Sequence, residues 1–581
     1  MEMINIKING IDLAVEKGTT ILEAAHAAGI EIPTLCYLKD VNEIGACRIC
    51  LVEVKGARGP VAACVYPIDR EGTEIFTNTP EIVKSRKTTL ELILSNHRRN
   101  CLSCVRSTNC ELQKLAQEYG VDEETFSGDK TPSIFDTSAS HMYRDNSKCI
   151  LCRRCSAVCK NNQAVGVIGA NERGFNTYIG CAFEAELAET SCVNCGQCIV
   201  ACPTGALSER DDTQKVIDAI NDPTKHVIVQ TAPSVRVGLG EEFGMPIGSL
   251  VTGKMVTSLR MLGFDKVFDT NFTADLTIME EATEFLDRYT KKENLPLITS
   301  CSPGWVKFAE HYYPDLIPNI SSCKSPQGMF GAVAKTYYAE KMGIDPKDIF
   351  SVSIMPCTAK KFEAERTDHS AVEGLADVDV SLTVRELGRM IKKAGIKFTE
   401  IPDGEFDTPF GLGSGAGTIF GATGGVMEAA LRTAYEVLTG ETLEDLKFEA
   451  VRGTEGIKEA SYTIAGNVIN VAVASGLSNA KKLLDMVKSG EKNYDFIEIM
   501  ACPGGCVNGG GQPIVPSQIR NFTDVKKIRA ASLYNDDENL PVRKSHENPD
   551  IKRIYEEYFE KPGSHKAHHI LHTGYVARPK Y

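Results

Sequence analysis

Cysteine spacing constrains this chain more than any other feature of its sequence. Sixteen of the 21 cysteines lie within the first 202 residues, nearly all at the short, regular spacings typical of metal ligands. The other five are scattered: Cys301, Cys323, Cys357, Cys502 and Cys506. The dense set indicates a series of redox centres, whereas the sparse set indicates a separate site at which the electrons take part in a chemical reaction.

The composition indicates a multidomain globular protein. At 581 residues, the chain is long enough for about four domains of ordinary size. Its net charge of −13 argues against a nucleic-acid partner, because such proteins usually present a basic face. The first residues show no signal-peptide pattern, and no apolar run is long enough to span a bilayer. We therefore expect a reducing, anaerobic cytoplasm and no membrane span.

The first four cysteines lie in a segment of short strands and one helix. Residues 4–8 and 11–15 predict a hairpin, and residues 21–28 predict a helix. Four thiolates match the demand of a [2Fe–2S] cluster, although tetrahedral zinc sites use similar pairs. The strand–helix setting resembles plant-type ferredoxin domains and favours the iron cluster. Its predicted ligands are Cys36, Cys47, Cys50 and Cys64.

A second set combines one histidine with three cysteines. His97 precedes Cys101, Cys104 and Cys110, which together make a complete tetrahedral set. Alone, this set fits either zinc or a histidine-ligated [4Fe–4S] cluster. Its place between other cluster motifs favours iron. The spacing resembles a segment of iron hydrogenases and of an electron-input subunit of respiratory complex I.

The third set is an internal repeat. The four cysteines at 149–159 are mirrored by four at 192–202, with the spacing of bacterial two-cluster ferredoxins. In that pattern, the fourth cysteine of each run ligates the cluster of the other run. Cys181 lies outside the pattern and is expected to be structural. The predicted ligand sets are Cys149, Cys152, Cys155 and Cys202 for one [4Fe–4S] cluster, and Cys192, Cys195, Cys198 and Cys159 for the other.

From about residue 225 the pattern changes to alternating strands and helices. Alternation of this kind predicts parallel α/β layers. The expected fold class is a multidomain α+β and α/β protein, in which ferredoxin-like iron–sulfur domains precede a large α/β domain. The strand patterns lie at 226–231, 267–269, 296–300 and 349–355, and the helical patterns at 276–289 and 306–313.

Three cysteine-bearing segments of this domain lie at strand ends, where α/β folds place their sites. They read Thr-Ser-Cys-Ser-Pro-Gly-Trp at 299–305, Met-Pro-Cys-Thr-Ala-Lys-Lys-Phe-Glu at 355–363, and Glu-Ile-Met-Ala-Cys-Pro-Gly-Gly-Cys-Val-Asn-Gly at 498–509. If they converge, they bring four thiols, a lysine and several glycines to one place. The glycines would let the backbone approach a bulky inorganic group closely. These segments resemble the three signature motifs of iron-only ([FeFe]) hydrogenases, and the resemblance covers essentially the whole chain.

The resemblance implies reversible oxidation of dihydrogen at an H-cluster, a [4Fe–4S] cubane joined to a diiron subsite. That subsite carries carbonyl, cyanide and an amine-containing dithiolate. Cys357, Cys502 and Cys506 match cubane ligands, and Cys506 also matches the bridge between the two parts. Lys360 matches a lysine that hydrogen-bonds a cyanide. The residues that match the lining of the diiron pocket are Ala232, Pro233, Ser234, Gln327 and Met355.

The first motif departs from the family pattern. The family commonly has two adjacent cysteines there, the first a proton relay and the second a cubane ligand. This chain has Cys301 followed by Ser302. In strict register Cys301 falls on the relay and Ser302 on the ligand. Serine is a poorer iron ligand than a thiolate, which favours Cys301 as the ligand, so both roles remain open for Cys301.

The resemblance also implies a proton path through Cys301, Glu281, Ser321, Glu284 and Arg288. Glu281 and Glu284 are three residues apart on one helical face, which suits a relay. An ordinary solvated acidic face is the alternative interpretation of the same spacing.

The remaining features complete the domain plan. Cys323 is expected to be a packed thiol, and the Gly-rich run at 411–425 to be close backbone packing, since it lacks a nucleotide-binding pattern. The expected domains are a [2Fe–2S] ferredoxin-like domain at 1–80, a one-histidine three-cysteine segment at 81–138, a two-cluster ferredoxin domain at 139–212, an H-cluster domain at 220–536 and a small-subunit-like tail at 537–581.

The expected partners follow from the same resemblance. The extra amino-terminal domains resemble those of catalytic subunits of NAD(P)-linked, often electron-bifurcating, hydrogenases. That implies a flavoprotein partner bearing the nucleotide site, ferredoxin as a second acceptor, and a hetero-oligomer. A stand-alone ferredoxin-linked hydrogenase is one alternative. The others are an electron-input subunit of a complex I-like or formate dehydrogenase-like enzyme, which would lack the three later motifs, and a non-catalytic assembly or sensor protein.

Overall fold

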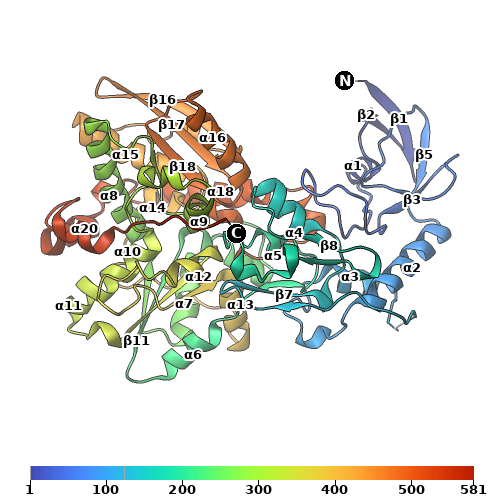
Figure 1. Cartoon of the computed structure of the whole chain (residues 1–581), viewed down its shortest axis with the longest axis horizontal. Coiled ribbons are helices and arrows are strands. Elements are labelled where there is room, and N and C mark those ends of the chain that lie inside the picture. Colours follow the sequence, from blue (N-terminus) through green and yellow to red (C-terminus); the bar gives the residue numbers. More distant parts are fainter. Residues whose placement is uncertain (1, 123–124, 581) are drawn as a thin grey trace.

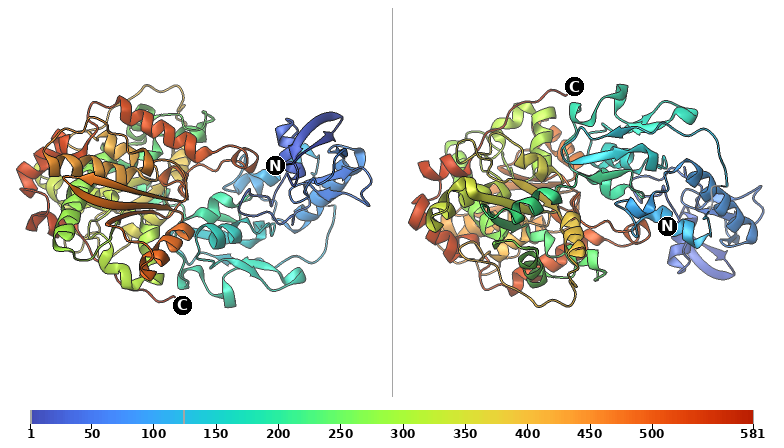
Figure 2. Two further views of the ribbon diagram at one scale, coloured as in Figure 1. Left: turned by 90° about the horizontal axis from the view of Figure 1, so that it is seen from above. Right: turned by 90° about the horizontal axis from the view of Figure 1, so that it is seen from below.

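The molecule is elongated, with a large body at one end and smaller amino-terminal domains at the other (Figures 1 and 2). The structure is a computed structural model that describes residues 2–122 and 125–580. The amino terminus lies in the domain farthest from the large body, and the carboxy terminus returns to the junction between the two parts (Figure 1). Cluster-binding segments therefore lead from one end of the molecule toward the large domain.

The first domain is a five-stranded sheet with one helix. In sheet order its strands are β2 (Ile11–Glu16), β1 (Met3–Ile8), β5 (Thr73–Phe76), β3 (Leu51–Val54) and β4 (Val61–Ala62). The predicted hairpin is the antiparallel pair β1–β2. Helix α1 (Ile21–Ala27) begins after Thr20, which exchanges hydrogen bonds with Glu23 in a capping box. It ends one residue before the predicted end.

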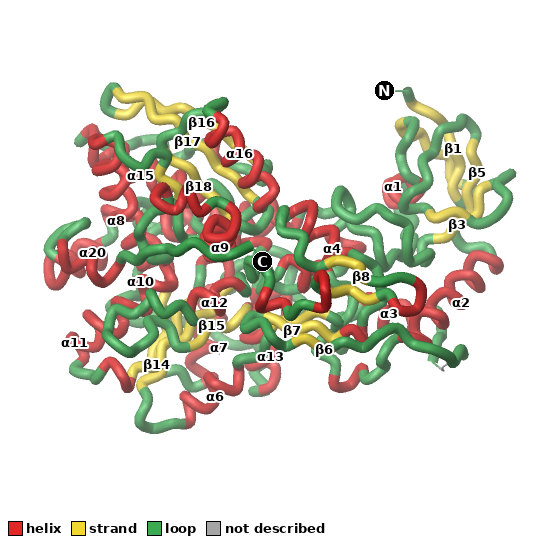
Figure 3. The backbone as a smooth tube through the Cα atoms, in the orientation of Figure 1, coloured by secondary structure: helices red, strands yellow, loops and turns green. Residues whose placement is uncertain are grey.

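The next two segments consist mostly of loops around short elements, as Figure 3 shows. The longer helices are α2 (Pro80–Asn96) and α3 (Glu111–Glu118). Each ferredoxin run carries one short helix, α4 (Arg154–Ala157) and α5 (Gln197–Ala201). Two small sheets brace them: β10 (Leu207–Glu209), β7 (Met142–Asp145) and β6 (Phe135–Asp136), and the pair β8 (Gly169–Asn171) and β9 (Tyr178–Gly180).

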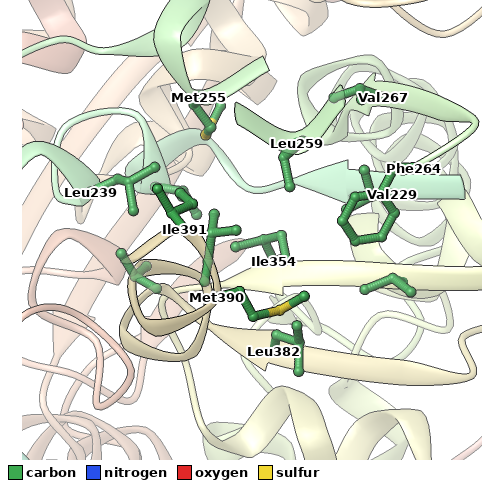
Figure 4. Packing of buried hydrophobic residues seen from close by; sticks show 14 of the residues in the cluster. Val229, Leu239, Met255, Leu259, Phe264, Val267, Ile354, Leu382, Met390 and Ile391 are labelled. Carbon is green, nitrogen blue, oxygen red and sulfur yellow. The ribbon is translucent and has the colours of Figure 1, made fainter. Parts of the chain in front are cut away.

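The first sheet of the large domain is parallel. Its order is β12 (Lys266–Asp269), β11 (His226–Thr231), β14 (Ile349–Met355) and β15 (Val380–Thr383). Helices α7 (Thr252–Leu262) and α13 (Val384–Lys393) pack on it, and Figure 4 shows Val229 and Ile354 meeting Leu259 and Ile391 in one buried cluster. This sheet confirms the predicted parallel α/β layers.

The second sheet is mixed. Its order is β13 (Leu297–Ile298), β18 (Phe496–Met500), β17 (Asn467–Ser475) and β16 (Ile457–Ile464). The first three strands are parallel, and β16 pairs antiparallel with β17 at the edge. The strand predicted at 296–300 is only two residues long, because its ladder with β18 stops at Ile298 and the chain then turns toward Cys301.

The central helix α8 (Thr270–Lys291) is longer than predicted. Asp269 caps it by accepting a hydrogen bond from Asn271 N, and the first half of the helix is buried. Gly417 of the glycine-rich run lies against it, since a Cβ there would come within 2.6 Å of the Asn271 carbonyl oxygen. The neighbouring helices are α9 (Pro303–Tyr312), α10 (Pro326–Val333), α14 (Gly415–Ile419) and α15 (Gly425–Thr439).

The carboxy-terminal tail is built into the large domain. Helix α18 (Val525–Asn539) leads into it, and it contains α19 (Pro549–Ile554) and α20 (His565–Leu571). Its buried Ile551, Phe559 and Leu571 join the same apolar cluster as Phe330 of α10. The histidine-rich end of the chain therefore lies over α10 and close to α8.

No helix in residues 2–122 or 125–580 combines the length and the apolar character that crossing a bilayer requires.

The second ferredoxin run packs backbone to backbone against the large domain. A Cβ on Gly510 would lie 2.2 Å from the carbonyl oxygen of Cys195, and one on Gly196 would lie 2.3 Å from Thr358 Oγ1. Gln197 Nε2 also donates a hydrogen bond of 2.8 Å to the Asn508 carbonyl. Only glycine permits this approach, because any side chain would separate the two surfaces.

We predict that Gly510→Ala destabilises the protein by about 1–3 kcal/mol, the usual cost of overpacking a tight contact. A lower Tm in calorimetry would show it. Gly59→Ala is the matched control, since a Cβ at Gly59 meets no atom within 4 Å. An unchanged Tm in Gly510→Ala would contradict the close packing.

Candidate metal centres and active site

The four cysteines of the first domain converge in its core. Cys50 Sγ lies 3.3 Å from Cys64 Sγ, and Cys47 N donates a hydrogen bond of 3.4 Å to Cys36 Sγ. Hydrogen bonds from Cys47 and Cys64 lower the pKa of Cys36, which favours the thiolate that a metal requires. Four thiols within contact of one another fit the predicted [2Fe–2S] site, although the geometry alone also suits zinc.

His97 has the character of a metal ligand. Burial lowers its pKa to about 4, so the ring is neutral at physiological pH, the form that binds metals. Its Nδ1 is buried and lacks a hydrogen-bond partner among the described residues. Cys110 lies near enough to Cys104 for that neighbour's charge to act on it, and Cys104 N bonds to the Cys101 carbonyl. These observations fit a one-histidine, three-cysteine site.

The two ferredoxin runs cross as predicted from their spacing. Three cysteines of the first run and the last cysteine of the second line one cavity. In the other set, burial and then the charges of Cys159 and Cys192 raise the pKa of Cys198. Cys159, the last cysteine of the first run, therefore lies beside the cysteines of the second run. The cysteines that line the cavity are Cys149, Cys152, Cys155 and Cys202.

The second run lies next to the cysteines of the large domain. After burial, the charge of Cys502 is the largest influence that raises the pKa of Cys195. Together with the Gly196 and Gly510 contacts, this proximity puts a ferredoxin-type site one loop away from the large domain's site. At this contact the two sites meet backbone to backbone.

Cys357, Cys502 and Cys506 gather from two different sheets. Cys357 follows β14, and Cys502 follows β18. Burial and then the charge of Cys357 raise the pKa of both Cys502 and Cys506. Crowded, buried thiols of this kind resist ionisation when no metal is bound. Bound iron would supply the positive charge that makes them thiolates. The three positions fit the predicted cubane.

Cys301 and Ser302 point to different neighbours. Burial raises the pKa of the Cys301 thiol well above its usual value, and the charges of Glu281 and then Cys506 add to the effect. The Ser302 hydroxyl accepts a hydrogen bond of 3.2 Å from Ala501 N, directly before Cys502. Cys301 therefore lies on the side of the carboxylates, and Ser302 on the side of the cubane cysteines.

The strand ends of the parallel sheet form the wall of the expected diiron pocket. Ala232 follows β11, and its N donates a hydrogen bond of 3.0 Å to the Ile354 carbonyl, next to Met355. Pro233 and Ser234 follow it into a buried turn. Ser234 Oγ is buried and has no hydrogen-bond partner among the described residues. An unpaired buried hydroxyl fits a pocket that receives a polar group.

Lys360 is held at the same pocket by fixed partners. Its Nζ donates hydrogen bonds to Ser325 Oγ at 2.7 Å, to Glu363 Oε2 at 2.8 Å and to the Cys301 carbonyl at 3.2 Å. Gln327 Nε2 donates to the same Glu363 oxygen at 2.9 Å. The ammonium is therefore positioned beside Cys301, and donation to a bound anion would replace one of these three hydrogen bonds.

Glu281 is buried and unusually hard to ionise. Its side chain is 2 % exposed, and burial, together with the charge of Glu284, raises its pKa to about 8. Its Oε1 lacks a hydrogen-bond partner within the described part of the chain. A carboxyl group that exchanges its proton near neutral pH suits general acid–base work. The solvated-face alternative is wrong for Glu281.

The outer part of the predicted path is a connected network. Ser321 Oγ donates to Glu284 Oε2 at 2.9 Å, and Arg288 Nη2 donates to Glu284 Oε1 at 2.5 Å. Arg288 is further fixed by the carbonyls of Pro318 and Ile320, at 3.0 and 3.1 Å. The structure thus brings together the residues that the resemblance placed in one proton path.

Two cysteines outside the ligand sets are buried. Cys181 Sγ lies 4.0 Å from Arg144 Nη1, within the core of the ferredoxin runs. Cys323 is fully buried, but it is more than a packed thiol, since its Sγ lies 3.7 Å from Glu284 Oε2.

Sequence reasoning missed the residues that hold the cysteine loops. Arg385 donates to the Gly510 carbonyl at 2.8 Å, and Arg529 donates to the Val507 carbonyl at 2.7 Å. Both guanidinium groups are buried and paired with carboxylates. No local motif marks them, because their partners lie tens to more than a hundred residues away.

Comparison with protein families reproduces the order of these segments. Residues 225–510 match the iron only hydrogenase large subunit, C-terminal domain, and residues 523–578 match the iron hydrogenase small subunit. Residues 1–80 match a 2Fe-2S iron-sulfur cluster binding domain, residues 86–125 the NADH-ubiquinone oxidoreductase-G iron-sulfur binding region, and residues 148–206 a 4Fe-4S dicluster domain.

Individual relatives agree with these family matches. The chain is 47% identical to the NADP-reducing hydrogenase subunit HndD of Solidesulfovibrio fructosivorans over the full length of both. It is 48% identical to iron hydrogenase 1 of Clostridium pasteurianum, over 99% of this chain and all of that one. A solved structure of a variant of [FeFe]-hydrogenase HydA1 from Chlamydomonas reinhardtii superposes with a TM-score of 0.57 at 46% identity, covering 63% of this chain and 99% of the other.

We predict that Cys301→Ala leaves the iron content unchanged, because Cys301 lies beside Glu281, whereas Ser302 is the residue that bonds to Ala501 N next to Cys502. Cys502→Ala, the matched control, should lower the iron content. Iron analysis and electron paramagnetic resonance of purified proteins measure both. Loss of iron in Cys301→Ala equal to that in Cys502→Ala would show instead that Cys301 is a ligand.

Proposed function

The chain belongs to the iron-only hydrogenase family, and on this premise we propose that it passes electrons between dihydrogen and a flavoprotein partner that binds NAD(P), with ferredoxin as a second acceptor. Reversible oxidation of dihydrogen is the activity of the family. The supporting observation for the longer route is the full-length similarity to the subunit named NADP-reducing, amino-terminal cluster segments included. The proposed complement is one [2Fe–2S] cluster, three accessory [4Fe–4S] clusters and the H-cluster.

The residues of the large domain fit the H-cluster. Cys357, Cys502 and Cys506 would hold the cubane, with Ser302 beside Cys502 at the place of the usual fourth ligand. When bound, this group splits dihydrogen into protons and electrons. The protein orients the group, excludes water and moves the proton. Lys360 would contribute to this orientation by exchanging one of the three hydrogen bonds that hold its ammonium beside Cys301.

The proton would leave along the predicted path of side chains. Cys301 receives it and passes it to Glu281, whose raised pKa of about 8 lets the carboxyl group hold and release a proton near neutral pH. From there it reaches Glu284 through Ser321, at 2.9 Å. Arg288 keeps the Glu284 carboxylate in place but carries no proton itself, because a guanidinium stays charged.

Electrons would leave toward the amino-terminal domains. They would pass from the Cys502 side to the second ferredoxin run, then to the first, and on to the His97 site and the [2Fe–2S] domain. The support for the first step is the contact of Gly510 with Cys195. A stand-alone hydrogenase that exchanges electrons with ferredoxin alone is the second candidate. Its support is the 48% identity to a relative whose name, iron hydrogenase 1, mentions no NADP.

Purification from the native source separates these two candidates. A copurifying flavoprotein, and hydrogen production from NAD(P)H that requires ferredoxin, would support the longer route. A monomer that evolves hydrogen with reduced ferredoxin alone would support the second candidate.

We predict that the protein, matured by the accessory proteins that assemble the cofactor, shows infrared bands of metal-bound carbonyl and cyanide and consumes dihydrogen. The Cys506→Ala variant should lose both bands, because it removes the proposed bridge. A matured protein without these bands would refute the H-cluster assignment.

We predict that Glu284→Gln lowers dihydrogen oxidation at least about 100-fold, since an amide cannot relay a proton. Asp287→Asn is the control, because Asp287 lies on the same helix with an exposed side chain that pairs with Lys291. Turnover with an artificial electron acceptor measures both variants, and their infrared bands show whether the cofactor is intact. Full activity in Glu284→Gln would exclude this path.

A further inference from the structure

One glutamine lies between the second ferredoxin run and the cubane cysteines. Gln197 stands between Cys195 and Cys198 in the sequence and is the first residue of α5. The residue is buried, with 1 % of its surface exposed. Its Nε2 donates a hydrogen bond of 2.8 Å to the carbonyl of Asn508, two residues after Cys506. Gln197 therefore belongs to the sequence of one metal site and reaches the loop of the other.

The backbone of Gln197 contacts the ferredoxin site. Burial and the charge of Cys502 raise the pKa of Cys195, and a hydrogen bond from Gln197 N opposes this rise by stabilising the thiolate. The turn into α5 directs this N–H group, because Gly196 has a φ of 66° there. The hydrogen bond therefore depends on the backbone and not on the glutamine side chain.

The side chain of Gln197 contacts the cubane site. Burial and then the charges of the two other cubane cysteines raise the pKa of Cys502, whereas a hydrogen bond from the Gln197 side chain lowers it. The Asn508 carbonyl can only accept, so it fixes the nitrogen of the amide on this side. An amide nitrogen carries two hydrogens, and the bond to Asn508 uses one of them. The other hydrogen is available to the Cys502 thiolate.

We propose that Gln197 sets the reduction potential of the cubane relative to that of the second ferredoxin cluster, by donating one hydrogen bond to a ligand of each. This inference rests on the proposed cluster complement. A hydrogen bond to a ligating thiolate stabilises the reduced state, which carries one more negative charge, and so raises the potential. Gln197 is a positioning residue, because it acts through Cys195 and Cys502 and not on dihydrogen.

The two hydrogen bonds respond differently to substitution. The bond to Cys195 remains in every variant except proline, because it comes from the backbone N–H. The bond to Cys502 is lost together with the side-chain amide. A change at position 197 should therefore shift the potential of the cubane and leave that of the second ferredoxin cluster in place. The difference between these two potentials decides how readily an electron passes from one site to the other.

Backbone N–H groups supply further hydrogen bonds to the cubane cysteines. Gly510 N donates to Cys502, and Ala359 N donates to Cys357. Replacing a side chain leaves such bonds in place. Gln197 is thus a position at which the amino-acid sequence controls hydrogen bonding to the cubane.

The test uses the matured, full-length protein and the variant Gln197→Met, whose side chain has a similar length but donates no hydrogen bond. We expect the equilibrium between oxidised and reduced cubane to shift about tenfold toward the oxidised form, which is a midpoint lower by about 59 mV for one electron. The iron content should not change, because Gln197 is not a ligand. Infrared spectroelectrochemistry measures the midpoint, since the carbonyl and cyanide bands of the attached diiron group shift when the cubane gains an electron.

Two controls accompany this variant. The midpoint of the second ferredoxin cluster, measured by electron paramagnetic resonance in the same samples, should stay unchanged. Gln214→Met makes the same replacement on the exposed face of α6 (Thr213–Asn221), where the amide donates to Asp218, and should leave both midpoints in place.

A second measurement detects the hydrogen bond itself. In protein labelled with ¹⁵N in its glutamine side chains, the electron spin of the reduced cubane should couple to a labelled nitrogen. This coupling should vanish in Gln197→Met and persist in Gln214→Met. A purely structural role of Gln197 would give no such coupling.

Three outcomes would overturn the inference: a cubane equilibrium in Gln197→Met within twofold of the parent, equal shifts at the cubane and the second ferredoxin cluster, or a parent without the nitrogen coupling. The coupling can also be measured on full-length protein that carries its iron–sulfur clusters but was made without the accessory proteins of maturation. If the coupling and the shift are present but the matured protein passes no electrons to a flavoprotein partner, the proposed function fails and this inference stands.

Discussion

The close contact between the second ferredoxin run and the loop after β18 is the constraint on which the rest of this structure depends. Electrons must leave a buried site, and each added layer of side chains would lengthen their path. Gly510 against Cys195 and Gly196 against Thr358 remove that layer. The buried ion pair of Arg385 with Glu209 then holds β10 and the Gly510 loop together. A buried pair of this kind serves geometry more than net stability.

The sequence sufficed for the features that are local in the chain. The crossed arrangement of the ferredoxin cysteines could be predicted because each run fixes its own spacing, as Cys149 and Cys152 illustrate. The cysteines at strand ends could be located because parallel strands place their carboxyl ends on one edge. The residues at which helices and strands end were less predictable. The ladder that limits β13 involves β18, about 200 residues away, and no local pattern of residues 296–300 contains that information.

Contacts between distant segments could not be predicted. Register alone left Cys301 with two possible roles, and only the fold shows that its neighbours are Glu281 and Cys506. The contact of His572 with Ser322 joins residues 250 positions apart, and histidines near the end of a charged tail are usually solvated. Burial of Glu281 depends on packing around α8, whereas its sequence spacing is the same as that of an exposed acidic face.

The docking of the tail has a consequence for the order in which this chain folds on the ribosome. Glu280 on α8 is fully buried, and its partners Tyr555, Gly563 and His572 are all synthesised about 300 residues later. Until these residues emerge, the Glu280 carboxylate has no hydrogen-bond partner. Burying it unpaired costs free energy, which disfavours packing the core around α8. The ferredoxin segment depends on later residues too, but on nearer ones, since its buried Glu209 pairs with Arg385, 176 residues further along the chain. In a nascent chain, the ion pair of Glu209 with Arg385 could therefore form well before the partners of Glu280 are synthesised.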